Sequence, residues 1–166
     1  MRVPIRKSEK YTYLKTDPCI TQAKFDELTK KLDRLINVNR PREAAEVQRL
    51  AMMGDFSENV GYQVAKGRLR GINQRILDIS DLLKKAEIIK PNKNDDSVQI
   101  GNFVTLEHDG REKTYQILGS EETNPTAGII SHNSPLGAAM LGKRIGDTFK
   151  IQLADRIIIY KIIKIS

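Results

Sequence analysis

The sequence predicts an α+β protein: a long N-terminal antiparallel coiled-coil hairpin of α-helices followed by a small C-terminal β-sheet domain with one short helix. Three observations support this. Apolar residues recur at helical spacing in two stretches before residue 90, a polar linker follows at residues 91–97, and strand-like runs bounded by glycine fill the rest. A chain of 166 residues is long enough for two such small domains.

The first helical arm is predicted over residues 21–53. Thr21 suits the N-cap position, and Phe25, Leu28, Leu32 and Leu35 follow at steps of three, four and three residues. Pro41 removes a backbone donor inside this pattern and therefore predicts a kink or a restart of the helix. At 1.5 Å per residue the arm is about 50 Å long.

The second helical arm is predicted from Ser57 to Ile89. Its apolar seam consists of Ile72, Ile76, Ile79, Leu83 and Ala86, and we expect Val60 and Val64 to extend it toward residue 57. Gly67 and Gly71 lower its helix propensity. The short break with Gly54 between the arms predicts an antiparallel hairpin. We therefore divide the chain into an irregular arm (1–19), a coiled coil (20–90), a linker (91–97) and a C-terminal domain (98–166).

Short strands and one helix are predicted in the C-terminal domain. Strand-like runs lie at 103–106, 115–118, 129–130, 149–153 and 156–165, and Asp109-Gly110 is a hairpin-turn pair. Ser134 and Pro135 suit the N-cap and first position of a helix that continues to Leu141.

The positive charge lies in one half of the chain. Residues 1–90 hold 19 Lys and Arg against 12 Asp and Glu, whereas residues 91–166 hold nine of each. This asymmetry favours a polyanionic partner, such as a nucleic acid, for the hairpin, although a solvated basic helix gives the same pattern. The single cysteine, Cys19, excludes a disulfide framework and a Cys-rich zinc site. No apolar run reaches the length of a membrane span, so we expect a soluble cytoplasmic protein.

Two carboxylates, Asp55 and Glu58, lie three residues apart in the break between the arms. Spacing alone favours an ordinary helix N-terminus, where acidic residues are stabilised by the helix dipole. Two carboxylates can alternatively supply part of the oxygen shell of a hard cation, provided that another molecule supplies the remaining ligands.

The run Gly54-Asp55-Phe56-Ser57-Glu58-Asn59-x-x-Tyr62 resembles the tip of the Gre transcript cleavage factors of bacterial RNA polymerase, the GreA/GreB family. Further similar segments follow in the same order over about residues 20–165. They are Ile20-Thr21 to Leu35, Arg40-Pro41, Tyr115 to Gly119, Ile130-Ser131, Ser134-Pro135-Leu136-Gly137, and Leu141-Gly142-Lys143 to Gly146-Asp147.

This resemblance implies a function in transcription elongation. The C-terminal domain would be FKBP-like and dock on the polymerase, with Ser134, Pro135, Leu136 and Gly137 in the docking segment. The coiled coil would enter the secondary channel and stimulate cleavage of the 3′ end of backtracked nascent RNA, an activity of the polymerase itself. Asp55 and Glu58 would help hold a magnesium ion of the polymerase, Ser57 would orient water or substrate, and Asn59 and Tyr62 would shape the tip.

The resemblance also implies RNA contacts from basic residues on the arms near the tip: Arg42, Arg49, Lys66, Arg68 and Arg70. We expect a monomer that binds no cofactor on its own and no membrane. Three alternatives are open: a related channel binder that inhibits polymerase without cleavage, a peptidyl-prolyl isomerase, and a plain coiled-coil nucleic-acid binder. Intact Asp55 and Glu58 argue against the first, and few aromatic residues after 98 argue against the second. His108 and His132 are expected in surface or turn positions.

Overall fold

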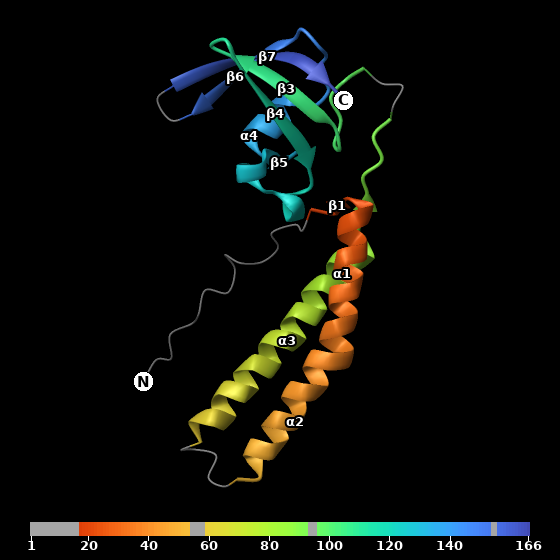
Figure 1. The fold of residues 1–166 in the computed structure, drawn as a ribbon, viewed down its shortest axis with the longest axis vertical. Helices are drawn as coiled ribbons and strands as arrows, with labels where there is room; N and C mark the ends of the chain where they lie inside the picture. Colours follow the sequence, from red (N-terminus) through yellow and green to blue (C-terminus); the bar gives the residue numbers. More distant parts are fainter. Residues whose placement is uncertain (1–16, 54–58, 93–95, 154–155) are drawn as a thin grey trace, which may run out of the picture.

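The computed structural model describes residues 17–53, 59–92, 96–153 and 156–166. These form a helical hairpin that extends away from a five-stranded sheet domain, with two very short strands at the junction between them (Figure 1). The α+β prediction is therefore confirmed. Across the described residues, no helix combines the length and apolar character that spanning a bilayer requires.

The first arm of the hairpin is helical from residue 22 to residue 51 and is interrupted as Pro41 predicts. It comprises α1 (Gln22–Arg34), a π-helical segment η2 (Leu35–Asn39) and α2 (Arg40–Ala51). Thr21 caps α1, because its side chain accepts a hydrogen bond from the Lys24 N–H. Pro41 lies in the first turn of α2, where a missing N–H costs least, and the wider π turn directly before it absorbs the irregularity.

The second arm, α3, spans Val60–Lys85 and is shorter than predicted at both ends. The backbone becomes extended at Ala86. It then forms β2 (Glu87–Ile88), which pairs in parallel with β1 (Cys19–Ile20). The helix was predicted to continue to Ile89 because Ala86 fits the apolar spacing. The strand pairing with residues almost seventy positions earlier is what ends it.

The apolar seam of the hairpin forms largely where it was predicted, in the half nearest the sheet domain, although Leu82, which was not predicted, is buried and Leu83 is only partly buried. Its buried members are Ile20, Leu28, Leu35, Ile79 and Leu82, with partly buried Phe25, Leu32, Ile72, Ile76, Leu83, Ala86 and Ile88 packed around them. Toward the tip the prediction is wrong. Val60 and Val64 are 75% and 46% exposed, and Ala65 is the residue that is buried there.

The C-terminal domain is a single sheet with strand order β5-β4-β3-β7-β6. Its strands are β3 (Phe103–His108), β4 (Arg111–Leu118), β5 (Ile129–Ser131), β6 (Thr148–Leu153) and β7 (Arg156–Ile165). Among the described strands of this sheet, β4 and β5 pair in parallel and all other neighbours are antiparallel. The predicted Asp109-Gly110 turn joins β3 to β4, and both residues have the positive φ that such a turn requires (50° and 71°).

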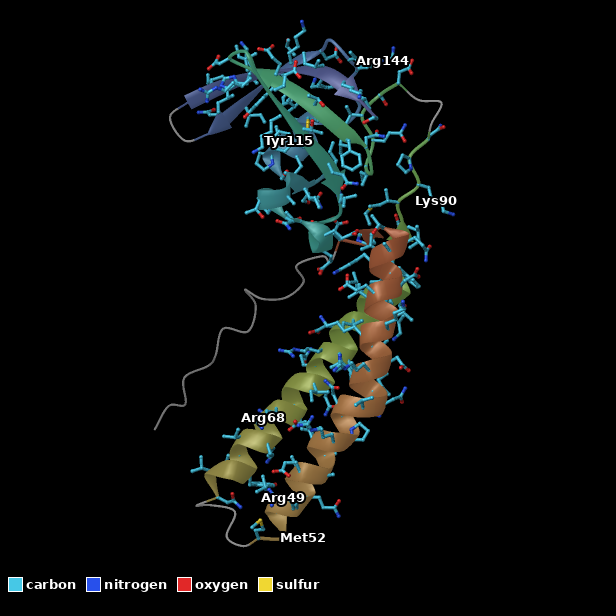
Figure 2. All side chains as sticks on the ribbon, viewed as in Figure 1. Arg49, Met52, Arg68, Lys90, Tyr115 and Arg144 are labelled. Atoms are coloured by element: carbon cyan, nitrogen blue, oxygen red, sulfur yellow. The ribbon has the colours of Figure 1, made fainter. Side chains whose placement is uncertain are left out.

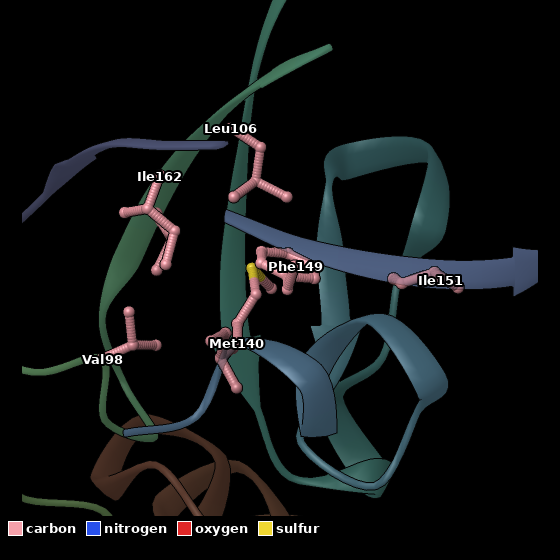
Figure 3. Packing of buried hydrophobic residues seen from close by; sticks show 8 residues of the cluster. Val98, Leu106, Met140, Phe149, Ile151 and Ile162 are labelled. Atoms are coloured by element: carbon pink, nitrogen blue, oxygen red, sulfur yellow. The ribbon is translucent and has the colours of Figure 1, made fainter. Parts of the chain in front are cut away.

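One helix, α4 (Pro135–Met140), packs on this sheet and closes its core. Met140 is fully buried and lies against the sheet residues shown in Figure 3. The buried members of this core are Val98, Val104, Leu106, Ile117, Met140, Phe149, Ile151 and Ile162. Two short 3-10 turns, η3 (Ser120–Glu122) and η4 (Pro125–Ala127), connect β4 to β5.

Polar contacts join the hairpin to the sheet domain, and we call this set the interdomain clasp: Asp17, Thr21, Ser120, Glu122 and Asn133. The Glu122 carboxylate accepts hydrogen bonds from the Thr21 N–H (2.7 Å) and hydroxyl (2.6 Å). The Asp17 carboxylate accepts from the Ser120 N–H (2.8 Å) and hydroxyl (2.9 Å), and from the Asn133 amide (3.3 Å).

Gly119 allows the chain to approach this closely. A Cβ atom on Gly119 would lie 1.7 Å from the Cys19 carbonyl oxygen, so no larger residue fits without moving the backbone.

Candidate functional site: the tip and the basic surface of the hairpin

The two helix ends that flank the tip are tied together by one side chain. Asn59 caps α3, because its Oδ1 accepts a hydrogen bond from the Tyr62 N–H (2.9 Å). Its Nδ2 donates to the Leu50 carbonyl in the last turn of α2 (3.1 Å). A single amide thus satisfies an orphan donor of one helix and an orphan acceptor of the other. The ends of the chain on either side of residues 54–58 are consequently held in a fixed relation.

The predicted tip residues Asp55, Ser57 and Glu58 lie outside the described residues. Their neighbours Met52, Met53 and Val60 are largely exposed, at 76%, 68% and 75%. Acidic residues at the tip are therefore flanked by apolar side chains that face solvent on both arms.

Three of the predicted basic residues converge from two helices. Arg49 forms a bidentate ion pair with Glu46 on α2, with Nε and Nη2 at 2.8 and 2.7 Å from the two carboxylate oxygens. The pKa of Glu46 is lowered chiefly by its hydrogen bond with Arg49 and also by the positive charges of Arg49, Arg68 and Arg42. Arg42 and Arg68 are thus close enough to act on the same carboxylate. Figure 2 shows Arg49 and Arg68 on neighbouring helices near the tip.

Lys66 and Arg70 form a second basic row on α3. Tyr62, Lys66 and Arg70 are four residues apart and therefore share one face of the helix, different from the face of Arg68. The Lys66 ammonium lies 5.8 Å from the centre of the Tyr62 ring, a cation–π contact. The five basic residues proposed from the sequence consequently form two rows, one around Glu46 and one in line with Tyr62.

An open groove of about 490 Å³ lies between the two arms. A Cβ atom on Gly67 or Gly71 would meet nothing within 4 Å. The two glycines therefore widen this groove rather than allow close packing of the helices. The other residues that line it are Leu35, Asn39, Glu43, Arg68, Ile72 and Arg75.

The segment assigned to docking has strong structural roles of its own. The Ser134 hydroxyl accepts from the Gly137 N–H (3.0 Å) and donates to the Ser131 carbonyl (2.6 Å), so Ser134 caps α4. Gly137 is buried, and a Cβ there would lie 2.2 Å from the Ser131 carbonyl oxygen. Leu136 packs on the core of the domain, and Pro135 is exposed. Of the four residues, Pro135 is thus the best placed to touch a partner.

Sequence reasoning missed the interdomain clasp entirely. Asp17 lies within the arm that was expected to be irregular, yet it is 8% exposed. Its hydrogen-bond partners Ser120 and Asn133 lie more than one hundred residues away in the sequence. No local sequence pattern predicts these contacts.

The fold defines a class of protein: a two-domain factor in which a basic helical hairpin is joined at its base to a separate sheet domain (Figure 1). Comparison with known proteins narrows this class. Residues 19–88 match the family model "Transcription elongation factor, N-terminal", and residues 92–166 match "Transcription elongation factor, GreA/GreB, C-term". The chain therefore belongs to the GreA/GreB family of transcription elongation factors.

Individual relatives cover most of the chain. A transcription elongation factor GreA from Thermomicrobium roseum is 37% identical over 149 residues, which are 89% of this chain and 96% of that protein. Another from Nautilia profundicola is 35% identical over 150 residues, 88% and 92% of the two chains. Among solved structures, GreA factor homolog 1 (Gfh1) of Thermus thermophilus aligns with 89% of this chain and 97% of its own at 26% identity, with a TM-score of 0.41.

Proposed function

We propose that this protein is a transcription elongation factor that binds bacterial RNA polymerase and stimulates cleavage of the 3′ end of backtracked RNA. The observation that supports this most strongly is that both halves of the chain match the family while the tip keeps Asp55 and Glu58. The chain itself is then not an enzyme, because the cleavage reaction belongs to the polymerase.

Asp55 and Glu58 would be the residues that reach the reacting centre. Their carboxylates are hard oxygen donors, which suit magnesium, but two carboxylates leave most of a shell of about six oxygens unfilled. The remaining ligands must therefore come from the polymerase. A magnesium ion held in this way would supply activation of water and charge stabilisation for phosphodiester hydrolysis. Ser57 would orient water or substrate beside the two carboxylates.

The rest of the hairpin would position this pair. Asn59 holds the ends of α2 and α3 together, so the tip is presented on a stiff support. Arg42, Arg49 and Arg68, and separately Lys66 and Arg70, would hold the RNA that leaves the active centre. Contacts from arginine and lysine to phosphates position RNA without reading its sequence.

A stalled, backtracked elongation complex tests the proposal. Asp55→Asn and Glu58→Gln each remove one negative charge and keep the shape of the side chain, so we expect at least a hundredfold loss of stimulated cleavage with nearly unchanged polymerase affinity. Asp26→Asn is a matched control, because Asp26 is exposed on α1 in the half of the hairpin away from the tip. Polymerase binding without any cleavage by the unmodified chain would instead support the alternative of an inhibitory channel binder.

A second measurement separates the two basic rows. We expect Arg42→Ser with Arg68→Ser, and in another variant Lys66→Ser with Arg70→Ser, to reduce crosslinking to the RNA 3′ end. Because phosphate contacts release counterions, the row that holds RNA should lose its effect as salt is raised. Equal losses of affinity for polymerase with and without RNA would show that the row contacts the enzyme instead.

A further inference from the structure

Three metal-ligating side chains come together at the junction between the hairpin and the sheet domain. Ligand atoms of Asp17, Cys19 and His132 all lie within 4.8 Å of one another. Asp17 and Cys19 belong to the segment that precedes α1, whereas His132 follows β5 in the sheet domain. This cluster is far from the tip and takes no part in the function proposed above.

The distances between these ligand atoms are close to those in an occupied metal site. Ligands at about 2.0 Å from a tetrahedral zinc ion stand about 3.3 Å apart, and a sulfur at about 2.3 Å stands slightly farther from its neighbours. The His132 Nδ1 and the Asp17 Oδ2 atoms are 3.3 Å apart. Thiolate, imidazole and carboxylate are together a donor set that suits zinc, whereas calcium and magnesium prefer oxygen alone.

The carboxylate of Asp17 is held in a defined orientation by its neighbours. Its Oδ2 accepts hydrogen bonds from the Ser120 N–H and hydroxyl and from Asn133. Its Oδ1 accepts a hydrogen bond from the Cys19 N–H at 3.1 Å, and the carboxylate is also hydrogen-bonded to the Cys19 thiol, a contact that an ion held by both side chains would replace. Ligating carboxylates in metal sites are typically fixed in this way by an outer layer of hydrogen bonds.

The other two ligands lie on either side of the junction. His132 Nδ1 lies 3.3 Å from Asp17 and 3.4 Å from the Leu118 carbonyl oxygen, and because a ligating nitrogen carries no proton, an ion bound by Nδ1 would replace these two contacts. Cys19 lies in β1, opposite Glu87 in the register of β2. Cys19 and His132 are only partly buried, so an ion can enter and a water molecule can complete its coordination.

The surroundings of Cys19 are negative. Burial raises the pKa of the Cys19 thiol, and the negative charges of Asp17 and Glu87 raise it further. A divalent cation held by Cys19 would therefore lie in the field of these two carboxylates.

We propose that Asp17, Cys19 and His132 form a binding site for a zinc-like transition-metal ion that bridges the hairpin and the sheet domain. The ion would add a coordinate link to the interdomain clasp. This departs from the sequence-based expectation that the isolated chain binds no cofactor.

The single cysteine makes the proposal directly testable in the chain of 166 residues. Cobalt(II) is the probe, because a cobalt–thiolate bond produces an intense near-ultraviolet charge-transfer band that carboxylate or histidine ligands do not produce. Any such band must come from Cys19, the only cysteine in the sequence. We expect the band to appear on cobalt addition and to disappear when zinc is added in competition.

Substitutions then assign the ligands. Cys19→Ser should abolish the band, and His132→Gln should weaken zinc binding at least tenfold in calorimetry. His108→Gln is the matched control, because His108 lies beside Asp109 on the far end of β3 and should leave binding unchanged. Circular dichroism establishes that each variant is folded.

Protection of the thiol provides an independent readout. Zinc should slow alkylation of Cys19 at least tenfold in the unmodified chain and in His108→Gln, but not in His132→Gln. Absence of the cobalt–thiolate band, or equal alkylation rates with and without zinc, would overturn the proposal. The cluster would then be a hydrogen-bonded contact only. None of these measurements involves polymerase, so their failure leaves the proposed function untouched.

Discussion

The two ends of the hairpin are built on different physical principles. Near the sheet domain, α1 and α3 bury a continuous apolar seam that includes Leu28, Leu35, Ile79 and Leu82. Near the tip, α2 has no buried residue, and Ala65 is the one buried residue in the first turns of α3. The tip instead depends on the polar link through Asn59. Stability is therefore concentrated at the base, which leaves the side chains of the tip free to face a partner.

The largest expected effect comes from the seam at the base. Leu28→Ala or Ile79→Ala should lower the free energy of unfolding by about 2–5 kcal/mol, because each creates a cavity between packed helices. Val60→Ala is the matched change at the exposed end and should alter it by less than about 0.5 kcal/mol. Denaturant unfolding followed by circular dichroism measures both. Comparable losses at the two positions would contradict the contrast between the ends.

The next effect concerns the junction. Gly119→Ala places a methyl group where the Cys19 carbonyl lies, so we expect a loss of about 1–3 kcal/mol and release of β1 from the sheet domain. Hydrogen exchange at the Glu87 and Ile89 amides, which donate to Pro18 and Ile20, should accelerate. Gly67→Ala is the control for the same substitution in open space. Unchanged exchange in Gly119→Ala would mean that the close approach is not required.

A smaller effect is expected at the tip. Asn59→Ala removes both links and should cost about 0.5–2 kcal/mol of helix stability. Asn59→Asp separates the two contacts, since a carboxylate still accepts from the Tyr62 N–H but cannot donate to the Leu50 carbonyl. If holding the arms together positions Asp55 and Glu58, both variants should slow stimulated cleavage while polymerase affinity stays the same. Normal cleavage by Asn59→Asp would show that capping of α3 is sufficient.

The smallest effect has the opposite sign. Gly67→Ala and Gly71→Ala should each stabilise the chain by about 0.5–1 kcal/mol, because alanine favours the helix and the new methyl group meets no neighbour. Thermal unfolding measures the gain. A loss of stability would mean that the groove between the arms closes in solution. A gain in stability accompanied by weaker stimulated cleavage would show that the open groove contributes to the cleavage function.

Much of the fold could be predicted from the sequence because the signals are local. The seams of Phe25 to Leu35 and Ile72 to Ala86 follow helical spacing, and the Asp109-Gly110 turn and the Ser134 cap each depend on a few adjacent residues. The prediction for Val60 and Val64 was wrong because it assumed that the larger apolar side chains near the tip face the other helix. There the inward position at residue 65 is filled by an alanine, and the larger valines face solvent.

The contacts between distant segments could not be predicted. β1 and β2 have two residues each, too short for any periodic signal, and they exist because they pair with one another. Glu122 and His132 have no sequence feature that points to residues 17–21. For the tip, the motif indicates Asp55, Ser57 and Glu58 more clearly than any structural argument, and their roles stay a prediction.

The interdomain clasp also bears on the order of folding. Its hydrogen bonds join residues separated by 101 to 116 positions, so the chain must close a very long loop before any of them forms. Both the hairpin and the sheet have contacts of shorter range and a core of their own. Closing a long loop costs chain entropy before the long-range contacts can form. The two cores should therefore assemble first and the interdomain clasp last. The relative orientation of the two domains would then be the final property of the molecule to be acquired, and the first to be lost on partial unfolding.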